Sequence, residues 1–374
     1  MSTSSEDPRT LAYERRKLLT TILGLVLSFV IPFGFLLGGG SEWLRDLVTG
    51  WTGESVAAAA AAYALLALVA LQLVESPLDF YSGYILERRF GLSRSGFGTW
   101  LADWLKGFAL QLVLLVVVAY AVYGLIASAP GVWWIIAGAG MSAFVILLTA
   151  IAPVFLFRLF YKFEPLPEGE LRRRLVALSD RLGVRIRGVY IWKLGEKTRR
   201  ANAALAGWGR TRRILLSDTL IEEHTADEIE VILAHEIAHQ VHWDIWKGIV
   251  VQSGLIFAGF FAVDLALDAW TTGLGLAGPT DVAAMPVLAL VISAVALVAL
   301  PAANGLSRRF EHAADVYALE VTGMRDQFIS AMEKLASQNM SRRRPNPIVE
   351  FVFHSHPSIA RRVEFARNWK PQVT

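Results

Sequence analysis

The stretch His235-Glu236-Ile237-Ala238-His239 decides how the rest of this 374-residue sequence is interpreted, because it carries the pattern H-E-x-x-H inside a segment of helical periodicity. Residues four positions apart lie on one face of a helix, so the two imidazoles can reach a single zinc ion. Glu236 can then act on water as a general base. The pattern is short and also arises by chance, so the surrounding sequence has to decide its meaning.

The composition is that of an integral membrane protein. Hydrophobic residues make up 54% of the chain and charged residues 18%, with a mean hydropathy of +0.45, whereas soluble domains carry about 25% charged residues. The net charge of +3 is too small to predict a nucleic-acid partner. The absence of cysteine excludes disulfides, thiolate ligands and a cysteine nucleophile. Any metal must therefore be bound by histidine and carboxylate side chains.

Six segments are long and apolar enough to cross a membrane, which takes about 20 residues. They are residues 18–37, 56–74, 108–127, 133–157, 245–263 and 285–306. The first segment has a signal peptide as its alternative interpretation, but it is long for one and lacks an A-x-A-like cleavage site.

The distribution of basic residues predicts the orientation of these spans. Arg15, Arg16 and Lys17 precede the first span and, by the positive-inside rule, place the N-terminus in the cytoplasm. Loop 75–107 and the long segment after the fourth span are also basic, whereas residues 271–284 contain no Lys or Arg. Six spans satisfy this alternation, so the H-E-x-x-H helix is expected at the cytoplasmic membrane face.

The spans divide the chain into four expected parts. Residues 1–160 hold four membrane helices and the cytoplasmic loop, residues 161–244 hold strands and the H-E-x-x-H helix, residues 245–306 form a membrane hairpin, and residues 307–374 follow it. Within the second part we expect a helix at 171–182, strands at 188–192, 202–208 and 213–216, and a capping box at Thr225-Ala226-Asp227-Glu228 that starts the histidine helix.

A catalytic zinc needs a third protein ligand. The extended pattern H-E-x-x-H-x-x-G-x-x-H is excluded, because His242 and Ile245 stand at its Gly and third His positions. Glu311, just after the sixth span, is the candidate, and Asp315 on the same helical face can accept the second N–H of a ligating histidine. The alternative is that both are solvated interfacial carboxylates.

Three further histidine positions lie in this half of the chain, and two of them, His242 and His312, compete as metal ligands. His242 is expected to support the site or lie at the surface, and His312 points about 100° away from Glu311 on a helix. His354-Ser355-His356-Pro357 lies near Arg361-Arg362. A positioned imidazole or guanidinium can stabilise the negative charge that builds on a carbonyl oxygen during amide hydrolysis, although a structural histidine is the alternative.

Taken together, these motifs resemble the type I CAAX prenyl endopeptidases, which are integral-membrane zinc proteases of the gluzincin kind, and their bacterial relatives. The resemblance runs from about residue 74 to residue 369. It is carried by Pro77, Tyr81, Glu87, Phe90-Gly91, Asp103, Lys106, the segment 163–169, Asn202-Ala203, the segment 213–220, His235, Glu236, His239, Glu311, Asp315, His356-Pro357 and Arg362. The chain departs from the family at Arg199-Arg200-Ala201 and at Ala204, next to the expected substrate strand.

The resemblance implies a mainly α, polytopic membrane protein with a small α+β zincin-like catalytic domain at the cytoplasmic face. It implies Zn²⁺ held by His235, His239 and Glu311, with Glu236 as the base. Asn202 and Ala203 would lie on an edge strand that grips the substrate backbone, and Arg362 is expected to contact substrate. His356 and Asp315 are expected to assist catalysis.

We therefore expect a zinc-dependent endopeptidase that acts on membrane-associated, prenylated or otherwise lipophilic peptides or membrane proteins. It would lie among lipid in the inner (cytoplasmic) membrane, with its active site toward the cytoplasm. The alternative is a non-catalytic zinc-binding membrane chaperone or quality-control factor, against which the intact Glu236 argues. A transporter is disfavoured, because the spans hold few ionisable residues.

Overall fold

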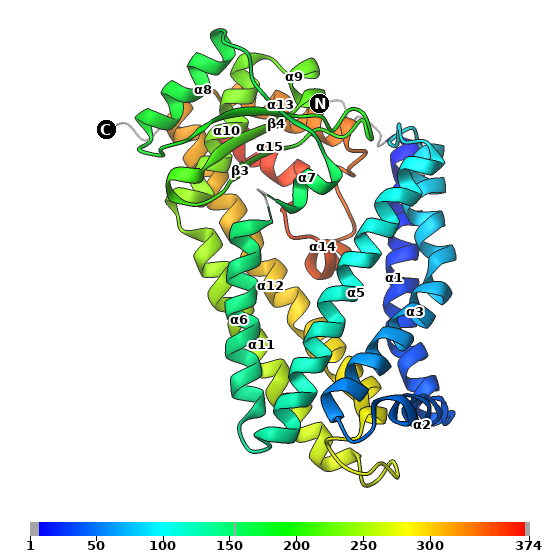
Figure 1. The fold of residues 1–374 in the computed structure, drawn as a ribbon. Coiled ribbons are helices and arrows are strands. Elements are labelled where there is room, and N and C mark those ends of the chain that lie inside the picture. Colours follow the sequence, from blue (N-terminus) through cyan, green and yellow to red (C-terminus); the bar gives the residue numbers. More distant parts are fainter. Residues whose placement is uncertain (1–6, 153–154, 371–374) are drawn as a thin grey trace.

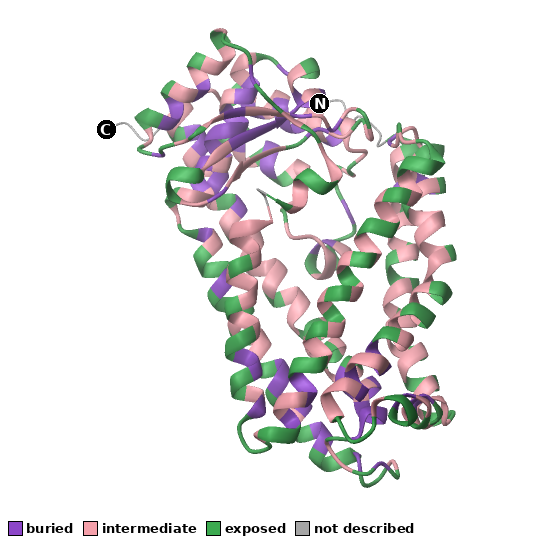
Figure 2. Ribbon diagram, in the orientation of Figure 1, coloured by how far each residue is buried: buried purple, intermediate pink, exposed green. Residues whose placement is uncertain are grey.

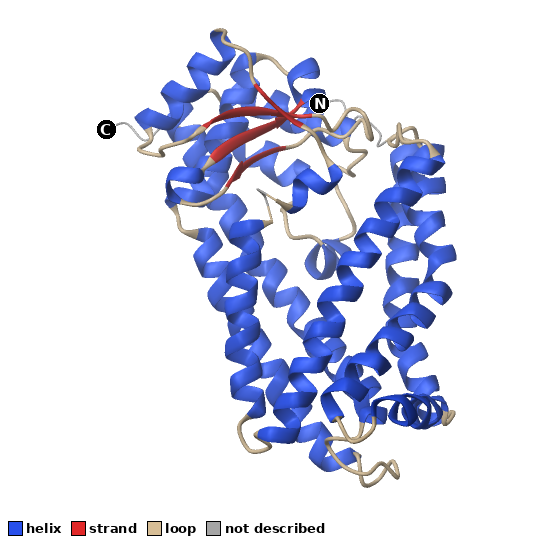
Figure 3. Cartoon of the chain, viewed as in Figure 1, coloured by secondary structure: helices blue, strands red, loops and turns tan. Residues whose placement is uncertain are grey.

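The computed structural model describes residues 7–152 and 155–370 and shows a set of long helices with a sheet-containing domain at one end (Figures 1 and 3). In this part of the chain, six helices are long and apolar enough to cross a membrane, as predicted. They are α1 (Pro8–Leu37), α3 (Val56–Phe80), α5 (Phe97–Ser128), α6 (Trp133–Ile151), α11 (Asp244–Trp270) and α12 (Met285–Thr322). A π-helical turn, η1 (Tyr81–Ile85), and α4 (Leu86–Arg89) extend α3, and η3 (Val282–Ala284) leads into α12.

Several helices run past the apolar segments that predicted them. Asp7 caps α1 and Pro8 occupies its first turn, so α1 begins ten residues before position 18. The span predicted over 133–157 is too long, since α6 ends at Ile151 and a separate short helix, α7 (Leu156–Phe160), follows. The predicted span included residues 153–154, which lie outside the described residues.

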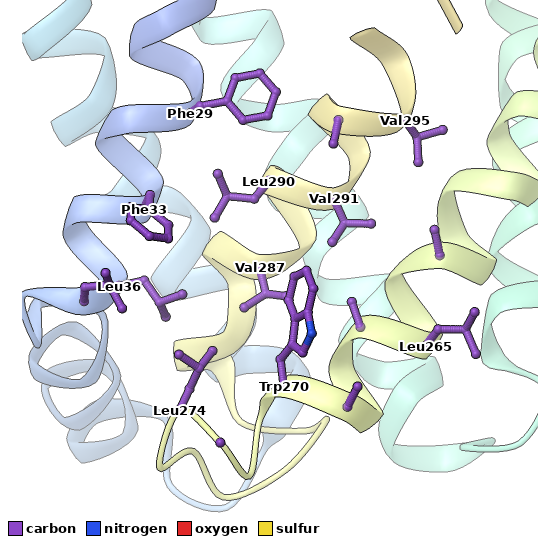
Figure 4. Close-up of a pocket in the computed structure, with 16 residues that line it drawn as sticks. Phe29, Phe33, Leu36, Leu265, Trp270, Leu274, Val287, Leu290, Val291 and Val295 are labelled. Atoms are coloured by element: carbon purple, nitrogen blue, oxygen red, sulfur yellow. The ribbon is translucent and has the colours of Figure 1, made fainter. Parts of the chain in front are cut away.

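Buried residues gather at the two ends of the molecule, as Figure 2 shows. At the end remote from the sheet, α2 (Gly40–Thr52) lies across the ends of α1 and α3 (Figure 1). Val48, Tyr63 and Trp133 are buried there in one apolar cluster. Close to this end, the last turns of α1 and α11 and the first turns of α12 line an apolar pocket of about 860 Å³ (Figure 4). Its lining of hydrocarbon side chains suits contact with lipid chains.

The sheet has four strands in the order β1-β2-β4-β3. They are β1 (Phe163–Pro165), β2 (Gly188–Trp192), β4 (Arg213–Ser217) and β3 (Ala203–Ala206). Strands β2 and β4 are parallel, and the other two pairings are antiparallel. The three strands predicted from sequence are present, although β3 is shorter than 202–208 because Gly207 turns the chain at φ = 94°. In the described sheet β3 pairs with β4 alone, so one side of β3 is an edge.

Helices pack around this sheet and complete a second apolar core. They are α8 (Glu170–Arg181), α9 (Asp218–Glu223), α10 (Ala226–Val241), α13 (Arg325–Gln338) and α15 (Ile359–Asn368), with a 3₁₀ turn, η2 (Gly209–Thr211), between β3 and β4. The short helix α14 (Pro347–Phe353) lies instead against α12. Leu175, Ile214, Leu233 and Phe328 are almost fully buried in this core. The predicted capping box starts α10, since Thr225 and Glu228 each bind the other's backbone N–H.

Candidate metal centre and active site

Three side chains from two helices converge beneath the sheet. His235 and His239 lie one turn apart on α10, and Glu311 comes from the part of α12 that runs past the predicted span. Nε2 of His235 lies 3.3 Å from Oε2 of Glu311, and Nε2 of His239 lies 3.4 Å from its Oε1. One ligand atom from each residue falls within a 4.8 Å cluster. Of the seven histidines in the sequence, only these two belong to such a cluster within the described residues.

The geometry of these atoms fits a small metal ion. Two ligands that each lie about 2.0–2.1 Å from a tetrahedral ion are about 3.3 Å apart, which matches both distances to Glu311. Oε2 of Glu311 is buried and accepts no hydrogen bond within residues 7–152 and 155–370. A buried carboxylate oxygen without a donor is costly unless a cation accompanies it. Two imidazoles and a carboxylate are also a common donor set for zinc.

Carboxylates hold the remaining nitrogen of each histidine. Oδ1 of Asp315 lies 2.9 Å from Nδ1 of His235, in the place that the sequence predicted. Oδ2 of Asp244 lies 3.1 Å from Nδ1 of His239, a partner that sequence reasoning missed. In the neutral imidazoles that bind metal, such contacts place the N–H on Nδ1 and leave the lone pair of each Nε2 on the side of Glu311.

Both histidines titrate unusually in this environment. Burial acts to lower the pKa of His235, but its polar contacts with Asp315 and Glu311 outweigh burial and raise the pKa to about 9. Burial also opposes protonation of His239, and contacts led by Glu311 raise its pKa. The cluster therefore attracts positive charge strongly.

Arg362 on α15 lies behind His235 and is 9% exposed. Its Nε donates to Oδ2 of Asp315 at 2.8 Å, and its Nη2 lies 3.5 Å from Nδ1 of His235. Burial acts to lower the pKa of Arg362, and the Asp315 carboxylate outweighs it and raises the pKa. Arg362 thus positions the Asp315 carboxylate, and that carboxylate in turn orients the His235 imidazole. The sequence-based prediction that it contacts substrate stays a prediction.

Glu236 lies on α10 beside the ligand cluster and is partly exposed. Within the described residues no hydrogen bond engages its carboxylate, so both oxygens are available to a water molecule. Burial raises the pKa of Glu236, while the neighbouring His235 and His239 act to lower it. A carboxylate with a raised pKa is a stronger proton acceptor, which is the property a general base requires.

His356 also lies next to the metal-ligand cluster. Its side chain is 61% exposed, and its Nε2 lies 3.2 Å from Oε1 of Glu311. Ser355 Oγ lies 2.9 Å from its Nδ1. His242 and His312 lie outside the His-His-Glu cluster. His242 packs against Tyr317, and His312 packs against Phe365.

Asn202 and Ala203 stand at the start of the edge strand. Ala203 is the first residue of β3, and Asn202 precedes it by one residue, with its backbone N–H donating to Ser217 Oγ at 2.9 Å. Ser217 N–H returns a hydrogen bond to the Asn202 carbonyl. The strand packs against α10, so its open edge runs beside the histidine helix.

Two acidic residues of the membrane part hold the segment that leads into this strand. Glu87 on α4 accepts from Arg200 at 2.9 Å and from the Tyr13 hydroxyl at 2.7 Å. Asp103 on α5 is hydrogen-bonded to Lys197. The start of the edge strand is therefore tied to the membrane helices at two points.

Residues 165–370, more than half of the chain, match the model of Peptidase family M48. The chain belongs to peptidase family M48. Residues 4–162 of this M48 protein match a model described as CAAX prenyl protease N-terminal, five membrane helices. Four described helices in that region reach membrane-spanning length. The family resemblance predicted from the motifs is confirmed.

Two relatives show how far the similarity extends. The uncharacterized metalloprotease YhfN of Bacillus subtilis is 27% identical over 358 residues, which cover 95% of this chain and 84% of that protein. CAAX prenyl protease 1 of Saccharomyces cerevisiae is 28% identical over 313 residues, which cover 78% of this chain and 68% of that protein. The M48 protein is thus a multi-pass membrane metalloprotease, and its family implies a metal ion at the His-His-Glu cluster.

The fold has a solved counterpart. A crystal structure of S. mikatae Ste24p superposes with a TM-score of 0.84 at 22% identity, and the match covers 97% of this chain and 92% of that chain. The predicted architecture, mainly α and polytopic with a small sheet, is confirmed.

Proposed function

We propose that this M48 protein is a zinc-dependent endopeptidase that cleaves membrane-associated or lipophilic peptides, prenylated ones among them. The observation that carries the proposal is the convergence of three side chains, His235, His239 and Glu311, whose ligand atoms lie within 4.8 Å of one another. Beside them lies the carboxylate of Glu236, which makes no hydrogen bond to the described residues. A structural metal site needs no such carboxylate. The name of the yeast relative supports a prenylated substrate.

The proposed chemistry divides among the residues as follows. When bound, zinc supplies a Lewis acid that lowers the pKa of water and polarises a carbonyl. Glu236 takes a proton from the attacking water and returns it to the leaving amine. His356 donates to the oxygen on which negative charge develops. Asp315 and Asp244 keep the two imidazoles in the required tautomer.

The substrate is proposed to extend the sheet. Backbone N–H and C=O groups on the open edge of β3 can pair with an extended peptide, which brings its carbonyl beside α10. Strand pairing recognises backbone and leaves side-chain choice to the surrounding pockets. Asn202 and Ala203 would then contact the peptide close to the cleaved bond.

The proposal is tested with Glu236→Gln, which keeps the size of the side chain and removes the base. We expect an unchanged metal content and a loss of peptide cleavage of about 10²- to 10⁴-fold. The matched control is Glu222→Gln, an exposed position on α9. Metal analysis beside cleavage of a lipidated reporter peptide measures both quantities. If Glu236→Gln cleaves the peptide at the wild-type rate, Glu236 is not the general base.

We also propose that the sheet domain faces the cytoplasm of the inner membrane, as the basic segments predict. The cysteine-free sequence makes this simple to test. Arg325→Cys in the sheet domain and Thr272→Cys at the opposite end each introduce a single thiol. An impermeant maleimide added outside intact cells should label Cys only at position 272. Labelling at position 325 alone would show that the sheet domain faces the outside of the cell, opposite to the proposal.

A further inference from the structure

A second polar cavity lies apart from the metal cluster, between the first turns of α5, the end of α7 and the segment that joins β2 to β3. Its volume is about 400 Å³. Four lysines and two carboxylates line it, which gives a formal charge of 4 − 2 = +2. These are Lys106, Lys162, Lys193, Lys197, Asp103 and Glu196. Two of them, Asp103 and Lys106, belong to the family-like motif that the proteolytic site leaves unused.

Each lysine of this cavity has a carboxylate partner, and Lys193 pairs with Glu164, which lies outside the lining, at 3.0 Å. With Glu164 counted, a formal charge of 4 − 3 = +1 remains. Asp103 is committed to Lys197, and Lys106 reaches the same carboxylate at 3.5 Å. Lys162 pairs with Glu196 at 3.1 Å, but their side chains are 72% and 52% exposed. Exposed pairs of this kind contribute little stability, so a better anion can replace them.

The first turn of α5 adds a second source of positive potential. Gly98 and Thr99 line the cavity within that turn, and the N-cap residue is Gly96, which has no side chain to cap the helix. The N–H groups and the dipole of a helix N-terminus favour anions, and phosphate above all. The lysines and the helix end therefore favour the same kind of ligand.

The cavity lies at the level where phospholipid headgroups are expected. The apolar run of α5 begins at residue 108, just beyond Lys106, and α7 is the next helix in the chain after the membrane helix α6. Trp100 and Trp104 lie on the same stretch of α5, with ring centroids 6.3 Å apart, and tryptophan is enriched at membrane–water interfaces. Basic pockets between membrane helices at this depth bind anionic headgroups.

We propose that this cavity binds the phosphate headgroup of an anionic phospholipid, with the acyl chains running along α5. Lys193 and Lys197 belong to the segment that leads to Asn202, so the bound lipid would help to hold the start of the edge strand. The binding proposal stands independently of the proteolytic function.

The test compares phosphatidylglycerol with phosphatidylcholine on the purified full-length protein, with retained lipid counted by native mass spectrometry. The wild-type protein should prefer phosphatidylglycerol, and Lys106→Gln with Lys162→Gln should lower that preference on the order of tenfold. The matched control is Arg89→Gln with Arg173→Gln, two exposed arginines outside the cavity. The control should keep the wild-type preference.

Three results would overturn the proposal. The first is an equal loss of preference in the cavity pair and the control pair, which would reflect net charge alone. The second is an unchanged preference in the single variant Lys162→Gln, whose exposed side chain leaves folding intact. The third is thermal stabilisation by inorganic phosphate that equals the stabilisation by phosphatidylglycerol, which would identify a free-phosphate site.

Discussion

Asp244, the first residue of the membrane helix α11, holds Nδ1 of His239 at 3.1 Å. The intervening Trp243 adopts a left-handed backbone with φ = 61°, which turns the chain between α10 and α11. A bulky residue rarely takes this conformation without a compensating gain. Here the turn brings the carboxylate back to the imidazole, so the end of a membrane helix becomes part of the metal centre.

Replacing Asp244 by Asn should weaken metal binding while leaving the fold in place. The amide no longer favours the tautomer with its N–H on Nδ1, and loss of such a partner costs about 10- to 100-fold in affinity. Titration against a chelator of known affinity measures the change, with exposed Asp326→Asn as the control. Equal affinities in the two variants would show that the contact does not support the metal.

Replacing Arg362 by Lys separates a positioning role from a substrate contact. Arg362 donates from Nε to Oδ2 of Asp315 and from Nη2 to its Oδ1. A lysine keeps the charge but cannot make both of these hydrogen bonds. If Arg362 positions Asp315, as its burial indicates, the variant loses metal affinity and thermal stability while the KM of the remaining loaded enzyme stays close to wild type. A raised KM with wild-type metal affinity would instead support the sequence-based assignment to substrate.

Replacing His356 by Ala should lower kcat by about 10²- to 10³-fold, the usual effect of removing one donor to a developing oxyanion. The side chain is largely exposed, so metal content and stability should change little. His312→Gln serves as the control, because that ring packs against Phe365 away from the cluster. A parallel loss of metal in His356→Ala would assign the residue to metal binding.

Much of this architecture was accessible from sequence because the signals were local. Apolar runs predicted six spans, the capping box predicted where α10 starts, and i, i+4 spacing predicted that His235 and His239 share a face. Glu311 is predicted as the third metal ligand, because a chain without cysteine has to supply an oxygen or nitrogen ligand for that position. The structure brings it within 3.4 Å of both imidazoles.

The parts that the sequence did not reveal depend on tertiary geometry. Asp244 stands five residues after His239 and would face elsewhere on an uninterrupted helix, so only the turn at Trp243 brings it back. The sequence predicted a substrate contact for Arg362, and its burial against Asp315 follows from the docking of α15. Strand β1 has three residues and ends in a proline, too short for a periodic pattern.

The pKa of His235 predicts how metal binding depends on pH. Metal requires the neutral imidazole, so protons compete with it wherever the metal-free histidine is charged. Because contacts with Asp315 and Glu311 raise that pKa to about 9, affinity should rise with pH up to about 9 and then level off. An ordinary histidine, with a pKa of about 6.5, would level off more than two units lower. In Asp315→Asn the plateau should begin at a lower pH. Chelator competition at a series of pH values measures the profile, and a wild-type affinity that is constant above pH 7 would contradict the raised pKa.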